Sequence, residues 1–104
     1  MAKYMYIYHG GGMPETPEEG AKVMAAWEAW YGKLGANLVD GGGPVGQSHT
    51  VSADSVVDNG GPNPVSGYTV VDAPDLESAL KWAAECPMVA DGSGTAEVAP
   101  IMDM

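Results

Sequence analysis

The sequence predicts a single α+β domain over residues 1–104, with the element order β-α-β-β-α-β. This is the ferredoxin-like arrangement, an antiparallel sheet with two helices on one face. Three observations predict it. A chain of 104 residues fits one domain. Hydrophobic residues make up 45% of the chain, which is enough for a core. Two segments of helical periodicity are each flanked by short segments of strand character.

The first strand is expected over residues 3–9. Alternation places its three tyrosines on one face and Met5 and Ile7 on the other, so both faces are apolar or aromatic. Glycines and a proline in residues 10–14 end this strand in a loop.

The first helix is expected to begin at Thr16, which can cap it, with Pro17 at the first helical position. Glu19 stands where a capping box requires it, and Gly35 is placed to end the helix. Trp30 is expected to flank the buried stripe. That stripe repeats at helical spacing and consists of Val23, Met24, Trp27, Tyr31 and Leu34.

The middle of the chain predicts short strands separated by glycine-rich turns. Residues 36–40 form a second strand that runs into a loop at residues 41–44. Residues 48–53 form another strand, and Val56 and Val57 extend or bulge it, which leaves the strand count open by one. Residues 59–64 are a turn or loop.

The last third predicts a strand, a helix and a strand. The strand covers Gly67 to Asp72, and the closing strand runs from Thr95 to Ile101. Asp75 caps the helix between them, and Pro87 stops it. Trp82 flanks its buried face, which is expected to consist of Leu76, Ala79, Leu80, Ala83 and Ala84.

The charge balance excludes several kinds of partner. The chain has 14 acidic residues against four lysines and no arginine, for a net charge of −10. No cationic cluster exists that could bind nucleic acid or an anionic membrane. Cys86 is the only cysteine, so no internal disulfide forms, and we expect a cytoplasmic protein. The two histidines lack metal-ligand spacing, and we expect no metal and no cofactor.

The predicted fold implies a partner. Both helices cover one face of the sheet, so the other face should be polar if it met water. Whichever face of the first strand is covered, the other still carries three tyrosines or Met5 and Ile7. Because monomers rarely expose so large an apolar patch, we expect a homodimer, with a higher oligomer left open.

His9 and Asp40 are the candidate catalytic residues. Each ends a strand just before a glycine-rich loop, where functional groups often lie. A carboxylate that orients a histidine makes it a general base, suited to elimination or isomerisation. The alternative is that His9 is simply exposed at a strand end and Asp40 is a turn residue. The candidate substrate-binding residues, for which packing and surface roles are the alternatives, are Tyr6, Tyr8, Tyr68 and His49.

Several segments resemble the YCII-like proteins of the dimeric α/β-barrel group. They are the first strand, the glycine-rich turn at Gly41–Val45, the strand and helix from Gly67 to Ala83, Cys86-Pro87, and Glu97–Met102. The resemblance implies a single YCII-like domain whose paired sheets close into a barrel, and a His–Asp pair in those relatives that are enzymes. The chain departs from many relatives because it lacks their Asp-Gly-Pro-Phe stretch and has Asn59–Pro64 there.

Two functions therefore remain open. The first is a lyase-type or isomerase-type enzyme that acts on a small organic substrate with His9 as base and Asp40 as its orienting partner. The second is a non-catalytic dimer that binds a small molecule or serves as an accessory module.

Overall fold

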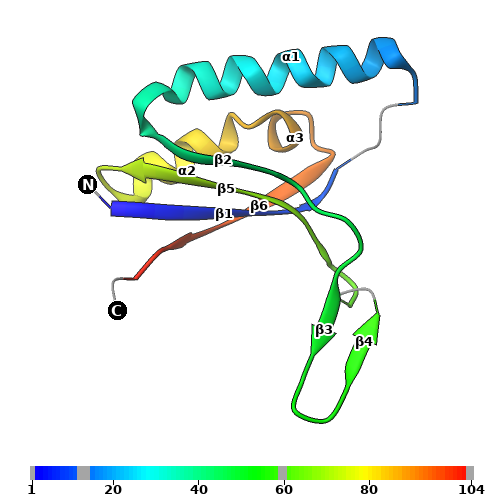
Figure 1. Cartoon of the computed structure of the whole chain (residues 1–104). Coiled ribbons are helices and arrows are strands. Elements are labelled where there is room, and N and C mark those ends of the chain that lie inside the picture. The colour runs from blue at the N-terminus through cyan, green and yellow to red at the C-terminus, as the bar shows by residue number, and fades with distance from the viewer. Residues whose placement is uncertain (1, 12–14, 59–60, 103–104) are drawn as a thin grey trace.

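The computed structural model describes residues 2–11, 15–58 and 61–102. Four antiparallel strands form the main sheet, in the order β2-β5-β1-β6. They are β1 (Ala2–Gly10), β2 (Leu38–Pro44), β5 (Val65–Ala73) and β6 (Gly94–Pro100). Helices α1 (Pro17–Leu34), α2 (Leu76–Ala84) and α3 (Pro87–Ala90) lie on one face of this sheet (Figure 1). The predicted α+β class with an antiparallel sheet is confirmed.

The segment at residues 48–53 does not belong to the main sheet. It contains β3 (His49–Val51), which pairs only with β4 (Val56–Asp58) in a separate two-stranded sheet. We call β3, β4 and the turn between them the arm. Val56 therefore starts a strand of its own and neither extends nor bulges the preceding one. After β2, the next strand along the chain that belongs to the main sheet is β5.

Both predicted helix starts and the first helix end are confirmed. Thr16 Oγ1 accepts a hydrogen bond of 3.1 Å from the Glu19 backbone N–H, and Asp75 Oδ1 accepts one of 2.8 Å from Ser78. Glu19 differs from a standard capping box because its carboxylate accepts from the Glu15 N–H. Gly35 ends α1 at a φ of 55° and is the first residue of a 3₁₀ turn, η1 (Gly35–Asn37).

The loop predicted at residues 41–44 is wrong, because these residues belong to β2. The pairing of β2 with β5 is irregular on both sides of Asp40. Gly42 has a φ of 63°, and a Cβ at this position would overlap the carbonyl group of Tyr68 on β5. Gly42 therefore allows a backbone approach between β2 and β5 that a larger residue would prevent.

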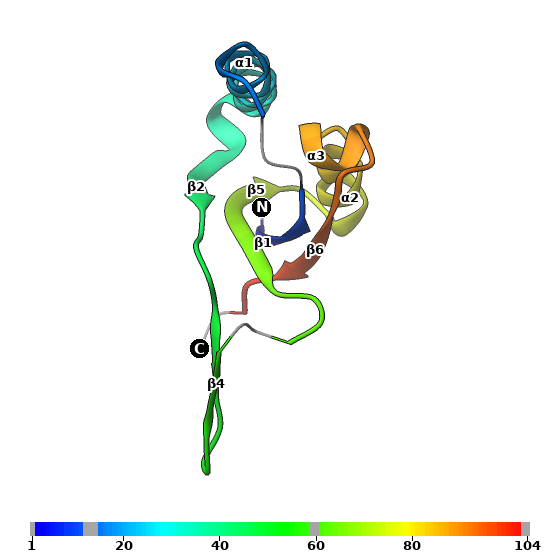
Figure 2. The ribbon, with the colours of Figure 1, turned by 90° about the vertical axis from the view of Figure 1, so that its right-hand side faces the viewer.

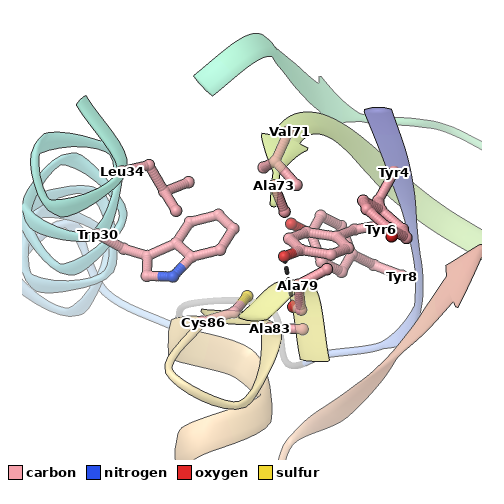
Figure 3. Close-up of a cluster of buried hydrophobic side chains, with 10 residues drawn as sticks. All are labelled: Tyr4, Tyr6, Tyr8, Trp30, Leu34, Val71, Ala73, Ala79, Ala83 and Cys86. Atoms are coloured by element: carbon pink, nitrogen blue, oxygen red, sulfur yellow. Dashed lines mark hydrogen bonds between the residues drawn. The ribbon is translucent and has the colours of Figure 1, made fainter. Parts of the chain in front are cut away.

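The core lies between the sheet and the helices (Figure 3). It consists of the three tyrosines of β1 with Trp30, Leu34, Val71, Ala73, Ala79, Ala83 and Cys86. The Tyr6 ring lies 6.1 Å from that of Trp30, and its hydroxyl donates to the Ala79 carbonyl at 2.6 Å. Tyr8 donates to Thr69 Oγ1, which in turn donates to the Gly41 carbonyl.

The predicted helix faces are partly wrong. On α1, Met24 is 65% exposed, whereas Trp30 is almost fully buried. Only the C-terminal half of this helix packs on the tyrosines, so the stripe is shorter and rotated toward Trp30. On α2, the small Ala79 and Ala83 face the sheet, which lets the helix lie close enough for the Tyr6 hydrogen bond. Leu34 is buried and Trp27 and Tyr31 are partly buried, as predicted. The other side chains of the predicted faces are exposed: Val23, Leu76, Leu80 and Ala84.

In the described part of the chain, the opposite face of the sheet is not covered by a helix (Figures 1 and 2). The side chains of β1 that alternate with the buried tyrosines point to this uncovered side. The strand register places their neighbours on β5 and β6 on the same side. We define the uncovered face by Met5, Ile7, His9, Tyr68, Val70, Glu97 and Ala99. No helix of the described residues is long and apolar enough to cross a membrane.

Candidate functional site

His9 lies on β1 where the pairing with β5 shifts register. Tyr8 pairs with Gly67, but His9 pairs with Val65, so β5 carries one extra residue at this point. Such bulges turn side chains away from the regular alternation and are common beside active sites. Across β6, His9 pairs with Thr95 and Ile7 pairs with Glu97. The register thus places His9 diagonally from Glu97 on the uncovered face.

Both ring nitrogens of His9 face oxygen atoms. Nδ1 lies 3.1 Å from the Asn63 carbonyl oxygen and 3.3 Å from that of Pro64. Nε2 lies 3.1 Å from Glu97 Oε1. Carbonyl and carboxylate oxygens are acceptors, so a proton on Nδ1 would be donated to the two carbonyls and a proton on Nε2 to Glu97. The His9 side chain is 14% exposed and that of Glu97 is 68% exposed, so Glu97 can move while the ring is held.

An open hollow of about 360 Å³ lies next to His9. Its walls are the connections between the arm and the main sheet, Val45–Ser48 and Pro62–Ser66, with Gly10 and Gly11 at the end of β1. The carbonyls of Asn63 and Pro64 that contact the His9 ring belong to this lining. A volume near the lower end of small-molecule pockets suits a single ring with polar substituents.

Ser48 is one of the residues that line this hollow. Its Oγ is buried and has no hydrogen-bond partner among the described residues. A buried hydroxyl without a partner is destabilising, and such groups in native proteins call for an explanation. A ligand in the hollow that hydrogen-bonds to Ser48 would provide one.

The structure does not bring Asp40 to His9. Asp40 pairs with Val70, which pairs with Met5 on β1, whereas His9 lies about 13 Å further along that strand. Asp40 Oδ1 instead accepts a hydrogen bond of 2.8 Å from the Gly42 N–H. This is the turn role that the sequence left open as the alternative for Asp40. The carboxylate beside His9 comes from Glu97, which the sequence reasoning did not single out.

The four candidate substrate-binding residues lie in different places. Tyr6 and Tyr8 are in the core, and their hydroxyls are engaged by Ala79 and Thr69, which argues against a role in binding substrate. Tyr68 is on the uncovered face and 37% exposed. His49 is in the arm, where its Nε2 lies 3.6 Å from Asp58 Oδ1.

The buried hydroxyl and thiol groups favour their protonated forms. Burial raises the pKa of Tyr6, Tyr8 and Tyr31 above the ordinary value of 10.0. Burial likewise raises the pKa of the Cys86 thiol, so this cysteine is not an activated nucleophile. Among residues 2–11, 15–58 and 61–102, no group of three or more His, Cys, Asp or Glu side chains is placed to hold a metal ion.

Comparison with known proteins shows to which family the chain belongs. The YCII-related domain matches residues 3–104, nearly the whole chain. The chain belongs to the YCII-related family. The resemblance of the strand and turn segments to YCII-like proteins is therefore confirmed. A search of the curated proteins found no match.

A solved structure of the YCII family has the same fold. It is the 5-chloro-2-hydroxyhydroquinone dehydrochlorinase TftG from Burkholderia phenoliruptrix AC1100, in complex with 2,5-dihydroxybenzoquinone. The TM-score is 0.57 and the sequence identity is 15%, and the match covers 96% of this chain and 95% of that one. At this identity the likeness shows the fold alone. The Asn59–Pro64 segment, where this chain departs from many YCII relatives, contributes Pro62, Asn63 and Pro64 to the hollow.

Proposed function

We propose that this YCII-related protein is a cytoplasmic homodimeric lyase that acts on a small hydroxylated ring at the hollow beside His9. The observation that carries the proposal is the His9 ring, which is held by two carbonyls and a carboxylate at the wall of a hollow of single-ring size. TftG is a dehydrochlorinase, which supports an elimination reaction, and the 2,5-dihydroxybenzoquinone in its structure supports a quinone-type ring.

The proposed reaction removes a proton and a leaving group from one substrate. Neutral His9, with its proton on Nδ1 toward the carbonyls, accepts the substrate hydroxyl proton at Nε2. This step acts on the keto tautomer of the ring, in which the carbon that carries the leaving group is saturated. The substrate oxygen becomes a carbonyl as electron pairs shift along the ring, and the leaving group departs from that saturated carbon with its bonding pair. Glu97 then stabilises the imidazolium through the contact at 3.1 Å. His9 and Glu97 thus replace the predicted pair of His9 and Asp40.

The homodimer part of the proposal rests on the uncovered face. The sheet order β2-β5-β1-β6 with helices on one side supports the ferredoxin-like arrangement that the dimeric α/β-barrel proposal requires. Tyr68 is exposed on the other side, and Met5, Ile7 and Val70 are only partly buried. A second sheet packed on this face would cover them and enclose His9 and Glu97, which lie on the same face.

The test is an assay of halide release from halogenated hydroxyhydroquinones. We expect wild-type protein to release halide and His9→Gln to lower kcat by about 100-fold or more. His49→Gln is the matched control, because that histidine pairs with a carboxylate outside the hollow lining, and its rate should equal the wild type. An unchanged rate in His9→Gln would refute the catalytic role.

The second candidate function is a binding module without catalysis. The unpartnered Ser48 hydroxyl favours a ligand in the hollow but does not itself require a reaction. Saturable binding of 2,5-dihydroxybenzoquinone, measured by calorimetry, with no turnover of any halogenated ring would support this second function over the first.

A further inference from the structure

No other described element of the protomer pairs with or covers the two strands of the arm. Every residue of β3 and β4 is exposed, including Val51 at 73%, Val56 at 63% and Val57 at 50%. The two strands pair only with each other. An isolated two-stranded hairpin is marginally stable in water, because it has no third element on which to bury its apolar side chains. The arm therefore needs a surface that this protomer does not supply.

The direction of the arm indicates where that surface lies. The arm extends beyond the sheet on the side away from the helices, as Figures 1 and 2 both show. Any molecule that packs on the uncovered face would lie beside it. When fully extended, the ten residues from Val45 to Asp54 reach at most roughly 33 Å. The outer two strands of a partner's four-stranded sheet lie only about 14 Å apart, so the arm is long enough to cross that sheet.

The apolar character of the arm and of the uncovered face indicates which molecule packs on them. Val51 and Val56 are directly paired, so they present one apolar face of the arm. The uncovered face offers Met5, Ile7, Tyr68 and Val70 on the same side of the molecule. One chain thus exposes both an apolar sheet face and an apolar arm beside it. A twofold axis through the uncovered face would let each copy use its arm on the other.

We propose that the arm is a clasp that packs against a second copy of this chain. This inference rests on the homodimer of the proposed function and adds to it a second contact outside the sheet-to-sheet interface. It also couples assembly to the site. The connections Val45–Ser48 and Pro62–Ser66 join the arm to the sheet and line the hollow, so seating the arm on the partner sets the hollow's shape.

The first experiment compares dimer affinities by sedimentation. The test variant is Val51→Asp with Val56→Asp, and both positions are exposed and outside the main sheet, so the core of the domain is left unchanged. The matched control is Val23→Asp with Met24→Asp, which adds the same charge at exposed valine and methionine positions of α1. We expect the arm variant to weaken the dimer at least tenfold and the control to match the wild type. Circular dichroism checks that both fold.

The outcomes separate the clasp from the homodimer. A wild-type protein that stays monomeric at micromolar concentration refutes both. A dimeric wild type whose affinity is unchanged in the arm variant refutes the clasp and leaves the sheet-to-sheet dimer in place. Equal weakening in the arm and α1 variants would mean that charge alone is responsible, which also overturns the clasp.

The second experiment locates the arm directly. Val57→Cys is labelled with a photoreactive maleimide, and the buried Cys86 is shielded from the reagent. An equimolar mixture of ¹⁵N-labelled and unlabelled chains is then irradiated and digested. We expect cross-linked peptide pairs in which one peptide is ¹⁵N-labelled and the other is unlabelled, with residue 57 of one chain joined to the other chain. Cross-links confined to single-isotope pairs, within one chain, would overturn the proposal.

Discussion

The Nε2 atom of His9 lies 3.1 Å from the Oε1 atom of Glu97, although 88 positions separate the two residues in sequence. The antiparallel pairing of β1 with β6 brings them together, because it sets the end of the first strand beside the start of the last one. The pair lies on the uncovered face, and the His9 ring contacts two carbonyls, of Asn63 and Pro64, that belong to residues lining the hollow. It is the one contact on which the proposed chemistry depends.

Glu97→Gln tests this contact. The amide keeps the size of the side chain but removes the charge that stabilises the imidazolium, so we expect kcat to fall at least tenfold with KM nearly unchanged. Steady-state halide release measures both constants. Glu77→Gln on α2 is the control, since Glu77 is exposed on the helix side of the molecule. Identical rates for wild type and Glu97→Gln would rule out the pair as a catalytic unit.

Ser48→Ala should have opposite effects on stability and binding. Removing the unpartnered buried hydroxyl should leave the free energy of unfolding unchanged or raise it by about 1 kcal/mol. The same change should weaken the binding of 2,5-dihydroxybenzoquinone by roughly tenfold, because its hydrogen-bond partner is lost. Urea unfolding and calorimetry measure the two effects. A destabilised variant with normal affinity would show that Ser48 has a structural role instead.

Two glycine substitutions should change stability in opposite directions. Gly42→Ala should lower the free energy of unfolding by about 2 kcal/mol or more, because its Cβ would overlap the Tyr68 carbonyl and its φ is positive. Gly32→Ala should raise it by about 0.5–1 kcal/mol, because this position of α1 has open space around it. Urea titration of both variants gives the comparison. A stable Gly42→Ala would mean that β2 does not approach β5 so closely.

The buried tyrosines predict a loss of stability in alkali. Burial raises the pKa of Tyr6 and Tyr8 above 10.0, so the folded state keeps protons that the unfolded state releases. Their contribution is therefore fully present below about pH 10 and decreases as the pH rises above it. Melting temperatures should fall over that range, and less steeply in Tyr6→Phe. If absorbance at about 295 nm showed the intact fold releasing as many phenol protons as the unfolded chain, the prediction would fail.

Much of the fold could be predicted from local patterns. Thr16 and Asp75 cap the helices as expected, and alternation in β1 correctly grouped the three tyrosines. The helix faces were less accurate, because hydrophobicity alone does not tell which apolar side chain contacts the sheet. Met24 and Leu80 are apolar but exposed, while Ala79 is small and fully buried. The close approach of α2 to Tyr6 determines which side chains of α2 are buried. That approach depends on tertiary packing, which the periodicity of the sequence does not reveal.

The site was harder to predict for a topological reason. His9 and Asp40 each end a strand before glycines, and this shared local pattern suggested a pair. Pairing depends on register, and the β2 irregularities beside Asp40 were not visible in the sequence. One signal could have found Glu97. The predicted arrangement places the first and last strands side by side, and Glu97 is the acidic residue within the closing strand, residues 95–101.

The position of the hollow at the root of the arm has a practical consequence. If the arm is seated only in the dimer, the shape of the catalytic cavity depends on the monomer–dimer equilibrium. Specific activity per chain would then rise with protein concentration, and substrate would in turn promote dimer formation, because the two equilibria are linked. Assays at nanomolar dilution would report an inactive protein where assays at cellular abundance report an active one.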